Sequence, residues 1–310
     1  MTRQLAHSGL SCFHVFRIRK IRGVPNSVAV WYNGPIDGRA LMATLYLSDL
    51  DGTLLQPDQT VSRFTIDTIG ALVGQGMRFS YATARSVVTA GQVTKGLAVE
   101  LPVIVHNGAF LRWPGTGEIL SGHYLGEEGR QVVTELTDRG VYPLVYSMNH
   151  GAERFRYLPE RMSEGMRRFL GTREGDPRAT PVRSPEALLE GDIYYITCVE
   201  ERKVLDRYHE AYRDRLRCIL YREIYSGDMF LELMPKTASK AAAALELKDR
   251  LGCDRLVVFG DGRNDLDLFR VADEAYAVAN ADEEVKAAAT AVIGSNREDG
   301  VARWLLDNVR

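Results

Sequence analysis

Short apolar runs alternate with segments of helical periodicity in the part of the chain that follows Met42. The runs Leu45–Leu47, Phe79–Ala82 and Val103–Val105 are short and continuous, as is typical of buried parallel strands. Between the first two runs, Ser62 stands where it can cap a helix whose apolar residues recur at helical spacing. This alternation of strand and helix predicts a parallel sheet with helices on both faces.

The pattern changes between about residues 122 and 235, where the regular alternation is lost. We expect a polar helix at about 126–138 and further helices near 160–170 and 201–215. The expected strands are 141–148, 152–158, 192–199, 217–224 and 230–234. The first two of these strands flank Asn149-His150-Gly151, a turn sequence that predicts an antiparallel hairpin. The segment is therefore expected to form a separate α+β module.

The first pattern resumes at the apolar run Leu256–Phe259, and shorter strands around 275–279 and 291–293 precede a C-terminal helix. The predicted fold class is α/β, with a Rossmann-like parallel-sheet core and an inserted α+β cap. The core is expected to comprise residues 43–121 and 236–310, and the cap residues 122–235.

Composition excludes several classes of function. The chain of 310 residues is 45% hydrophobic and 26% charged, with a net charge of −2, so nothing in it favours a nucleic-acid or membrane partner. No apolar run approaches the roughly 20 residues that span a bilayer. The four cysteines are scattered and form no CxxC pair, which indicates reduced thiols and predicts a cytoplasmic protein.

Residues 1–42 differ from the rest of the chain because basic residues dominate them. The first 41 residues hold six basic side chains against one acidic side chain, Asp37. The basic residues are Arg3, Arg17, Arg19, Lys20, Arg22 and Arg39. An organelle transit sequence is one interpretation; translation that begins at Met42 is the one we favour. A chain starting at Met42 is then expected to fold and to be active.

Polar side chains stand at the carboxyl ends of three predicted core strands. Asp49 and Asp51 follow the first strand, Thr83 the second, and Asp261 and Asp265 the strand that resumes the core. Ligands of an open α/β sheet bind beyond these strand ends, so the five side chains are expected to meet there. Four converging carboxylates repel one another, and a divalent cation relieves that repulsion. All-oxygen ligands favour Mg²⁺.

The order Asp-x-Asp-Gly-Thr after a strand makes chemical sense for phosphoryl transfer. Asp49 can act as a nucleophile, and Asp51 can serve as general acid towards the leaving group. Gly52 permits a tight turn whose backbone N–H groups can hold phosphate oxygens. Alternatively, the two aspartates only cap a turn. The second acidic cluster at Asp261 and Asp265 argues against that simpler reading.

These segments resemble the four motifs of the haloacid dehalogenase-like superfamily, and their order is most similar to that of the Cof-type phosphatases. The matching residues are Asp49-Leu50-Asp51-Gly52-Thr53, Thr83, Lys240 and Gly260-Asp261-Gly262-Arg263-Asn264-Asp265. The likeness covers about residues 43–310 and includes Asn107-Gly108-Ala109 and Asn296-Arg297-Glu298-Asp299-Gly300. It implies an α/β cap between the second and third motifs.

The resemblance also implies a role for each motif residue. Asp49 would be nucleophile and magnesium ligand, Asp51 the general acid/base that binds magnesium through its carbonyl, and Asp261 a further ligand. Thr83 would hydrogen-bond the phosphoryl group, and Lys240 would offset its charge. The supporting residues are Asn264, Asp265, Gly52, Arg85 and Asn107. The sequence departs from the pattern at Ala84, where the family usually has glycine, and Lys236 competes with Lys240 for the third motif.

The implied function is magnesium-dependent hydrolysis of a small phosphate monoester, such as a sugar phosphate or a phosphorylated cofactor, through an aspartyl phosphate. The alternatives are a sugar phosphomutase and a non-catalytic sensor of a phosphorylated ligand. In the cap, alternation along a strand places Arg154 and Arg156 on one face, which we expect to be solvated, although an arginine there could recognise an anionic substrate. His106 is expected to be a wall residue of the crevice.

Overall fold

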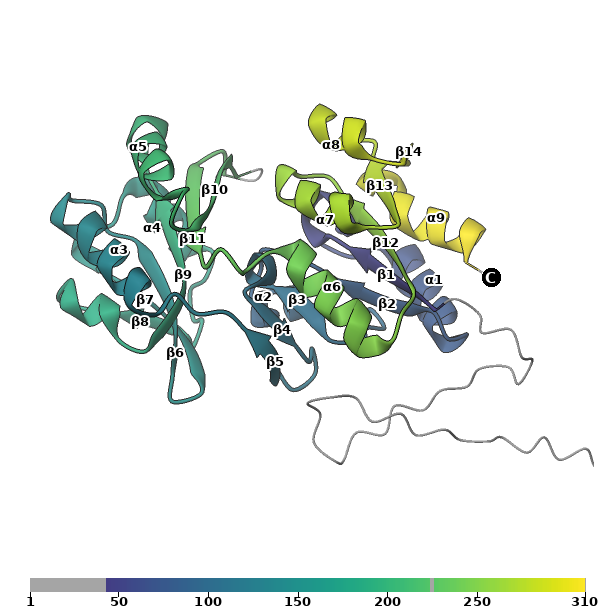
Figure 1. Ribbon diagram of the computed structural model, residues 1–310, viewed down its shortest axis with the longest axis horizontal. Coiled ribbons are helices and arrows are strands. Elements are labelled where there is room, and N and C mark those ends of the chain that lie inside the picture. Colours follow the sequence, from purple (N-terminus) through teal and green to yellow (C-terminus); the bar gives the residue numbers. More distant parts are fainter. Residues whose placement is uncertain (1–42, 224–225, 310) are drawn as a thin grey trace, which may run out of the picture.

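The computed structural model describes residues 43–223 and 226–309, arranged as two lobes with separate sheets (Figure 1). The interpretation of residues 1–42 lies outside the described residues. The larger lobe contains a five-stranded parallel sheet in the order β14-β13-β12-β1-β2. Its strands are β1 (Thr44–Ser48), β2 (Arg78–Tyr81), β12 (Arg255–Gly260), β13 (Glu274–Val278) and β14 (Ala291–Ile293). Leu45 and Leu47 of β1 are fully buried, as the apolar run predicts.

Helices cover both faces of this sheet. They are α1 (Arg63–Gly74), α2 (Val87–Val93), α6 (Lys240–Leu251), α7 (Leu266–Val271), α8 (Glu283–Ala288) and α9 (Gly300–Asn308). The predicted cap of α1 is confirmed, since the Ser62 side chain accepts a hydrogen bond from Thr65 N. From the central β1–β12 pair, the chain passes through α1 to β2 on one side and through α7 to β13 on the other side. Because both connections are expected to be right-handed, α1 and α7 lie on opposite faces of the sheet. The carboxyl ends of β1 and β12 form the switch point at which α/β proteins bind ligands.

The third predicted strand, β3 (Val103–Val105), belongs to the core only in part. One parallel bridge, Ala82 to Ile104, ties it to the segment after β2. It pairs fully with the antiparallel strand β4 (Phe110–Arg112), which pairs with β5 (Ile119–Gly122). The parallel sheet was the expected place for β3, because a buried apolar run carries no information about the direction of its partner strand. Strands β4 and β5 were not predicted.

The second lobe contains a six-stranded sheet, here called the cap sheet, in the order β10-β11-β9-β6-β7-β8. Its strands are β6 (Leu144–Asn149), β7 (Ala152–Tyr157), β8 (Ala179–Pro181), β9 (Asp192–Val199), β10 (Arg217–Arg222) and β11 (Met229–Met234). The β6–β7 hairpin at Asn149-His150-Gly151 is antiparallel as predicted. Of the strands in the cap sheet, the short strand β8 is the one that was not predicted, and it pairs parallel with β7.

The two faces of the cap sheet differ in what covers them. Helices α3 (Gly126–Asp138) and α5 (Arg202–Tyr212) pack on the outer face and form a separate apolar cluster with it. Figure 1 shows both helices on the side away from the parallel sheet. The inner face carries Tyr146, Tyr195 and Phe230, whose side chains join the hydrophobic core of the larger lobe. Helix α4 (Glu164–Gly171) contributes Met166 to the same cluster. The α/β fold with a parallel core is confirmed.

Candidate active site

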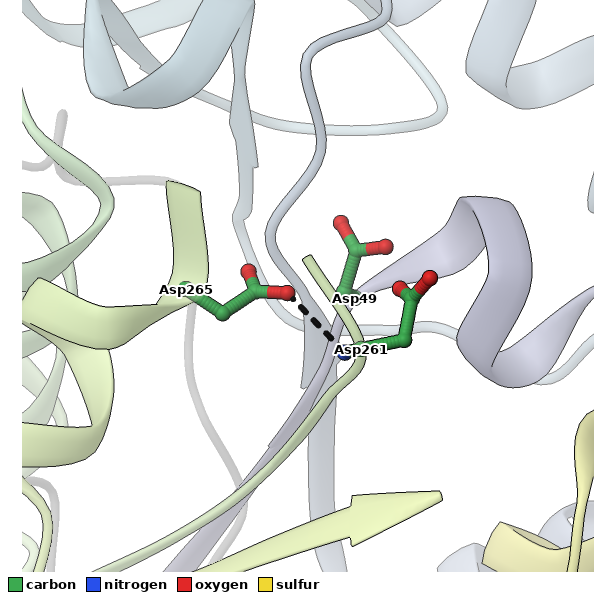
Figure 2. Close-up of side chains that lie close together, drawn as sticks. All are labelled: Asp49, Asp261 and Asp265. Atoms are coloured by element: carbon green, nitrogen blue, oxygen red, sulfur yellow. Dashed lines mark hydrogen bonds between the residues drawn. The ribbon is translucent and has the colours of Figure 1, made fainter. Parts of the chain in front are cut away.

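Three carboxylates gather at the switch point. Asp49 directly follows β1 and Asp261 directly follows β12, and these strands pair so that Asp49 N donates to Phe259 O at 2.9 Å. Asp265 lies one turn further along the chain. One carboxylate oxygen from each of the three aspartates lies within 4.8 Å of the others (Figure 2). Strand pairing thus brings together residues that are more than 200 positions apart.

Asp265 is held in place by three donors. Its Oδ2 accepts from the backbone N of Asp261 at 3.2 Å and of Gly262 at 3.1 Å, and the first of these bonds is drawn in Figure 2. Its Oδ1 accepts from Lys240 Nζ at 2.7 Å. The side chain is fully buried. Asp265 therefore fixes the loop after β12 while it presents one oxygen to the cluster.

Lys240 is the buried cation of the site. It is the first residue of α6, follows the cap residue Ser239, and is only 1% exposed. Its Nζ donates to Asp49 Oδ1 at 2.5 Å as well as to Asp265. Gly108 (φ +94°) fixes this helix end against the turn after β3, since a Cβ there would lie 2.2 Å from the carbonyl carbon of Ser239. The choice of Lys240 over Lys236 agrees with this placement, because Lys236 is exposed.

The electrostatics of the cluster are unbalanced. Burial raises the pKa of Asp49 well above its ordinary value, against the opposing charge of Lys240 and together with the charges of Asp265 and Asp261. Burial and the Asp265 charge raise the pKa of Asp261 to about 7. One ammonium group thus faces three carboxylates. The missing positive charge is what a bound divalent cation supplies.

The donor set fits such a cation. All available side-chain donors are carboxylate oxygens, which suit a hard ion such as Mg²⁺. Gly52 (φ +78°) brings the loop against Asp261, where a Cβ would lie 2.2 Å from Oδ2. Thr53 Oγ1 donates to Asp261 Oδ1 at 2.7 Å and fixes that carboxylate. Asn280 Nδ2 holds the same turn by donating to Gly52 O at 2.7 Å, a contact that the sequence did not reveal.

The Asp51 carboxylate pairs with Arg85 and is not part of the acidic cluster. Both of its oxygens accept from Arg85, Oδ2 from Nε at 2.7 Å and Oδ1 from Nη2 at 2.5 Å. Arg85 Nη2 also donates to Gln59 Oε1 at 2.7 Å. The geometric cluster therefore contains Asp265 in place of the Asp51 side chain. A contact of the Asp51 carbonyl with magnesium stays a prediction.

The remaining predicted residues link the switch point to the cap sheet. Thr83 is fully buried, and its Oγ1 accepts from Arg85 N at 3.1 Å. Asn107 Oδ1 accepts from Asn264 Nδ2 at 3.2 Å, and Asn107 Nδ2 donates to Glu232 Oε2 at 3.0 Å. The same Nδ2 donates to Tyr195 Oη at 2.8 Å. The Asn107 amide thus joins the fourth motif to the inner face of the cap sheet.

Sequence reasoning missed Glu232. It is the only acid in the apolar strand Met229–Met234, and that isolation was the available signal. It lies 7% exposed and accepts from Tyr195 Oη at 2.6 Å and Tyr221 Oη at 3.1 Å. Burial raises its pKa to about 7, although hydrogen bonds from both tyrosines and the charge of Lys240 act in the opposite direction.

The expectation for the cap arginines was wrong for Arg156. That residue is 2% exposed, and its guanidinium donates to Ser147 Oγ at 2.6 Å and to Glu190 Oε2 at 3.0 Å. Its face of β7 is covered, so it is not solvated. His106 is also buried, packed against the rings of Tyr146 and Tyr194.

A parallel α/β core that carries three aspartates and a buried lysine at its switch point, next to a second α+β lobe, defines a class of hydrolases. The model of the haloacid dehalogenase-like hydrolase family matches residues 46–305, and the chain belongs to this family. The membership that the motifs predicted is confirmed, and the protein is an enzyme of the phosphatase type.

Curated relatives cover nearly the same span. The chain is 25% identical over 275 residues to the 5-amino-6-(5-phospho-D-ribitylamino)uracil phosphatase YwtE of Bacillus subtilis, which covers 83% of this chain and 95% of the relative. It is 27% identical over 268 residues to YitU of the same organism, which carries the same activity name as YwtE. This match covers 83% of this chain and 94% of the relative.

Solved structures share the fold. TM0651 from Thermotoga maritima matches with a TM-score of 0.71 and 22% identity over 87% of this chain and 98% of that one. A haloacid dehalogenase-like hydrolase from Bacteroides thetaiotaomicron matches with a TM-score of 0.71 and 22% identity. The match covers 86% of this chain and 99% of that one. In the described residues, no helix combines the length and apolar character that crossing a membrane requires.

Proposed function

We propose that the protein is a magnesium-dependent phosphatase that hydrolyses a small phosphate monoester through an aspartyl phosphate on Asp49. The observation that carries the proposal is the buried Lys240 between Asp49 and Asp265, beside Asp261. It supplies a nucleophile, a cation for the phosphoryl oxygens and the oxygen donors for a metal in one place.

In the first step, Asp49 attacks phosphorus and the bond to the leaving oxygen breaks. Lys240 holds Asp49 Oδ1, whereas Asp49 Oδ2 accepts no hydrogen bond from a described residue. Oδ2 is therefore the oxygen that attacks. Thr83 and the backbone of the Gly52 turn hold the phosphoryl oxygens. Asp49, Asp261 and the Asp51 carbonyl would hold a Mg²⁺ ion, which would supply positive charge next to the transferred group.

Asp51 moves the protons. It donates a proton to the leaving oxygen and then takes one from the water that hydrolyses the aspartyl phosphate, which releases phosphate and restores Asp49. Arg85 engages both oxygens of Asp51 in this structure, and we propose that it orients the carboxylate until substrate binds. Asp265 and Asn264 position Asp261 and Asn107.

Residues 122–235 are proposed as the cap that selects the leaving group, and residues 43–121 and 236–310 as the catalytic core. The similarity to phosphatases of a ribityl phosphate supports a small polyol, sugar or cofactor phosphate as substrate. The inner face of the cap sheet carries Glu232 and several tyrosine hydroxyls, which are suitable partners for such a polar leaving group.

The test is phosphate release from a panel of esters with Mg²⁺ and with EDTA. The panel contains sugar phosphates, glycerol phosphate, flavin mononucleotide, pyridoxal phosphate and the ribityl phosphate named above. Release that requires Mg²⁺ and is lost in Asp49→Ala supports the proposal. Undiminished release in Asp49→Ala, with contaminating phosphatase excluded, would reject it.

A further inference from the structure

Arg173, two residues beyond the end of α4, is a cap cation with no acidic partner at ion-pair distance among the described residues. Its guanidinium carbon lies 3.5 Å from the centre of the Phe169 ring. Its Nη1 donates to Phe169 O at 3.0 Å and to Thr172 Oγ1 at 2.8 Å. Neither Nε nor Nη2 donates to a described residue, and no described carboxylate lies within ion-pair distance. Half of the guanidinium is therefore fixed and half is available.

Two other buried arginines of the cap, Arg178 and Arg156, have acidic partners. Arg178 pairs with Glu153 at 2.6 Å and with Asp176 at 2.6 Å. Arg156 pairs with Glu190. A partly buried guanidinium is costly to leave without a counter-charge. Among the described residues, Arg173 has its stacking on Phe169 and its hydrogen bonds to Phe169 O and Thr172 Oγ1 to offset that cost.

The position of Arg173 connects it with the proposed leaving-group side of the site. Burial lowers the pKa of Arg173; the charges of Arg178 and Arg85 add to this lowering, whereas Tyr146 and Asp176 oppose it. Arg85 in turn holds Asp51, the proposed acid that faces the leaving oxygen. The Phe169 ring packs edge-on against Phe230 of the inner face, with 5.2 Å between the ring centroids. This contact fixes the Phe169 ring under the Arg173 guanidinium.

We propose that Arg173 recognises a second anionic group, a carboxylate or another phosphate, on the leaving part of the substrate. This inference rests on the proposed function and narrows its substrate class. The transferred phosphoryl group has its own cation in Lys240, on the core side of the site. An anion on the leaving part would instead pair with Nε and Nη2 of Arg173, which present two parallel donors.

Matched ester pairs test the proposal. 3-Phosphoglycerate and glycerol 3-phosphate differ by a carboxylate at nearly constant size; fructose 1,6-bisphosphate and fructose 6-phosphate differ by a phosphate. Wild-type enzyme is expected to have the higher kcat/KM for the anionic member of at least one pair. Arg173→Gln is expected to lower that value about 10- to 100-fold, mainly through KM, and to change the neutral member less than about threefold.

Two control variants separate recognition from folding and from net charge. Arg167→Gln removes the same charge from an exposed position on α4 and is expected to leave both members of each pair unchanged. Arg173→Lys keeps the charge without the planar fork and is expected to recover part of the loss.

Binding provides a readout that does not need turnover. In an Asp49→Asn background, the anionic member of the preferred pair is expected to raise Tm more than the neutral member, and Arg173→Gln to remove that difference. Equal losses on both members, or a wild-type preference for the neutral member in both pairs, would overturn the inference while leaving the phosphatase proposal intact. Absence of phosphate release from every ester would instead reject the proposed function.

Discussion

Two buried charge clusters in this protein differ in their charge balance. The core cluster consists of Asp49, Asp261, Asp265 and Lys240, and the cap cluster of Arg112, Glu153, Asp176 and Arg178. The core cluster has three carboxylates for one cation, whereas the cap cluster has two of each. The side chains of both clusters are largely buried, so the comparison shows the effect of the ratio of carboxylates to cations.

The pKa values respond to that difference. In the core cluster the pKa of Asp49 and that of Asp261 are raised by burial and by neighbouring aspartates. In the cap cluster burial alone would raise the pKa of Glu153, but contacts with His106 and the charges of Arg178 and Arg112 hold it well below the ordinary value. A balanced cluster supplies its own counter-charges, so that removing one partner is destabilising, whereas an unbalanced cluster needs an ion or a ligand.

The cap cluster also joins parts of the chain that are distant in sequence. Arg112 of β4 donates to Glu153 of β7 at 2.7 Å, and Arg178 donates to the other oxygen of Glu153 at 2.6 Å. The first of these bonds connects the strand beside the core with the cap sheet. The cluster therefore fixes the arrangement of the two lobes, while the core cluster is arranged for chemistry.

Asp49→Asn should have the largest effect, because it should abolish catalysis without weakening the fold. It removes the proposed nucleophile, so phosphate release is expected to fall by more than about a thousandfold. It also removes one charge from an overcrowded site, so Tm without Mg²⁺ should stay level or rise. Asp67→Asn, at an exposed position on α1, is the control and should leave both quantities unchanged. A marked fall in Tm would mean that Asp49 is mainly structural.

Glu153→Gln should show the reverse pattern. It leaves Arg112 and Arg178 without their shared carboxylate, and the free energy of unfolding is expected to fall by about 3–5 kcal/mol. Chemical denaturation measures this loss, and the exposed Glu164→Gln provides the comparison. Activity per folded molecule should change far less than stability. Loss of activity at unchanged stability would contradict the structural role of the cap cluster.

The sign of the pH effect follows from the lowered pKa of Glu153. Its carboxylate contributes stability above the ordinary glutamate value of 4.5, and that contribution is lost as the pH falls through the lower folded value. The difference in the free energy of unfolding between wild type and Glu153→Gln should therefore become small only in strong acid.

The two clusters also differ in how far the sequence predicts them. Asp49, Asp261 and Asp265 follow their strands closely, and pairing of β1 with β12 brings these three together as the strand-end argument requires, whereas the Asp51 carboxylate pairs with Arg85 instead. Lys240 follows a helix cap and was found by its motif. A local signal marks each of these residues, and parallel-sheet topology supplies the rest.

The cap residues have no comparable signal. Alternation along β7 could not distinguish the face of Arg156 from a solvated one until its partners Ser147 and Glu190 were known. Nothing in the sequence marked Glu153, on the opposite face, as the partner of Arg112 and Arg178. Glu232 showed only as an isolated acid in an apolar strand. Side-chain roles in an antiparallel sheet depend on which segment covers each face, and that information is not local.

Magnesium should act on the core cluster alone. At a concentration about 100 times Kd, the ion is expected to stabilise the folded state by about 2.7 kcal/mol, seen as a rise in Tm between EDTA and Mg²⁺. Asp261→Asn should abolish most of that rise, whereas Glu153→Gln should retain it from a lower baseline. An equal rise in wild type and Asp261→Asn would place the ion elsewhere.

Glu232 belongs to neither cluster, and its substitution should give the smallest effect. Burial raises its pKa to about 7, so its neutral form stabilises the fold below the ordinary glutamate value, and this stabilisation is lost as the pH rises towards about 7. The groups that face it are Lys240, Tyr195, Tyr221 and, further away, Tyr146; none of these has its ordinary pKa between pH 5 and 8.

Between pH 5 and 8, wild type without Mg²⁺ is therefore expected to lose about 2 kcal/mol more than Glu232→Gln, as measured by urea denaturation at fixed ionic strength. The exposed Glu160→Gln should follow the wild-type curve. A Glu232→Gln curve parallel to wild type would mean that Glu232 remains ionised in the folded state, with its three hydrogen-bond donors and Lys240 outweighing burial. In that case Glu232 would behave like Glu153, and charge balance rather than position in the cap would decide which buried acids are stabilising.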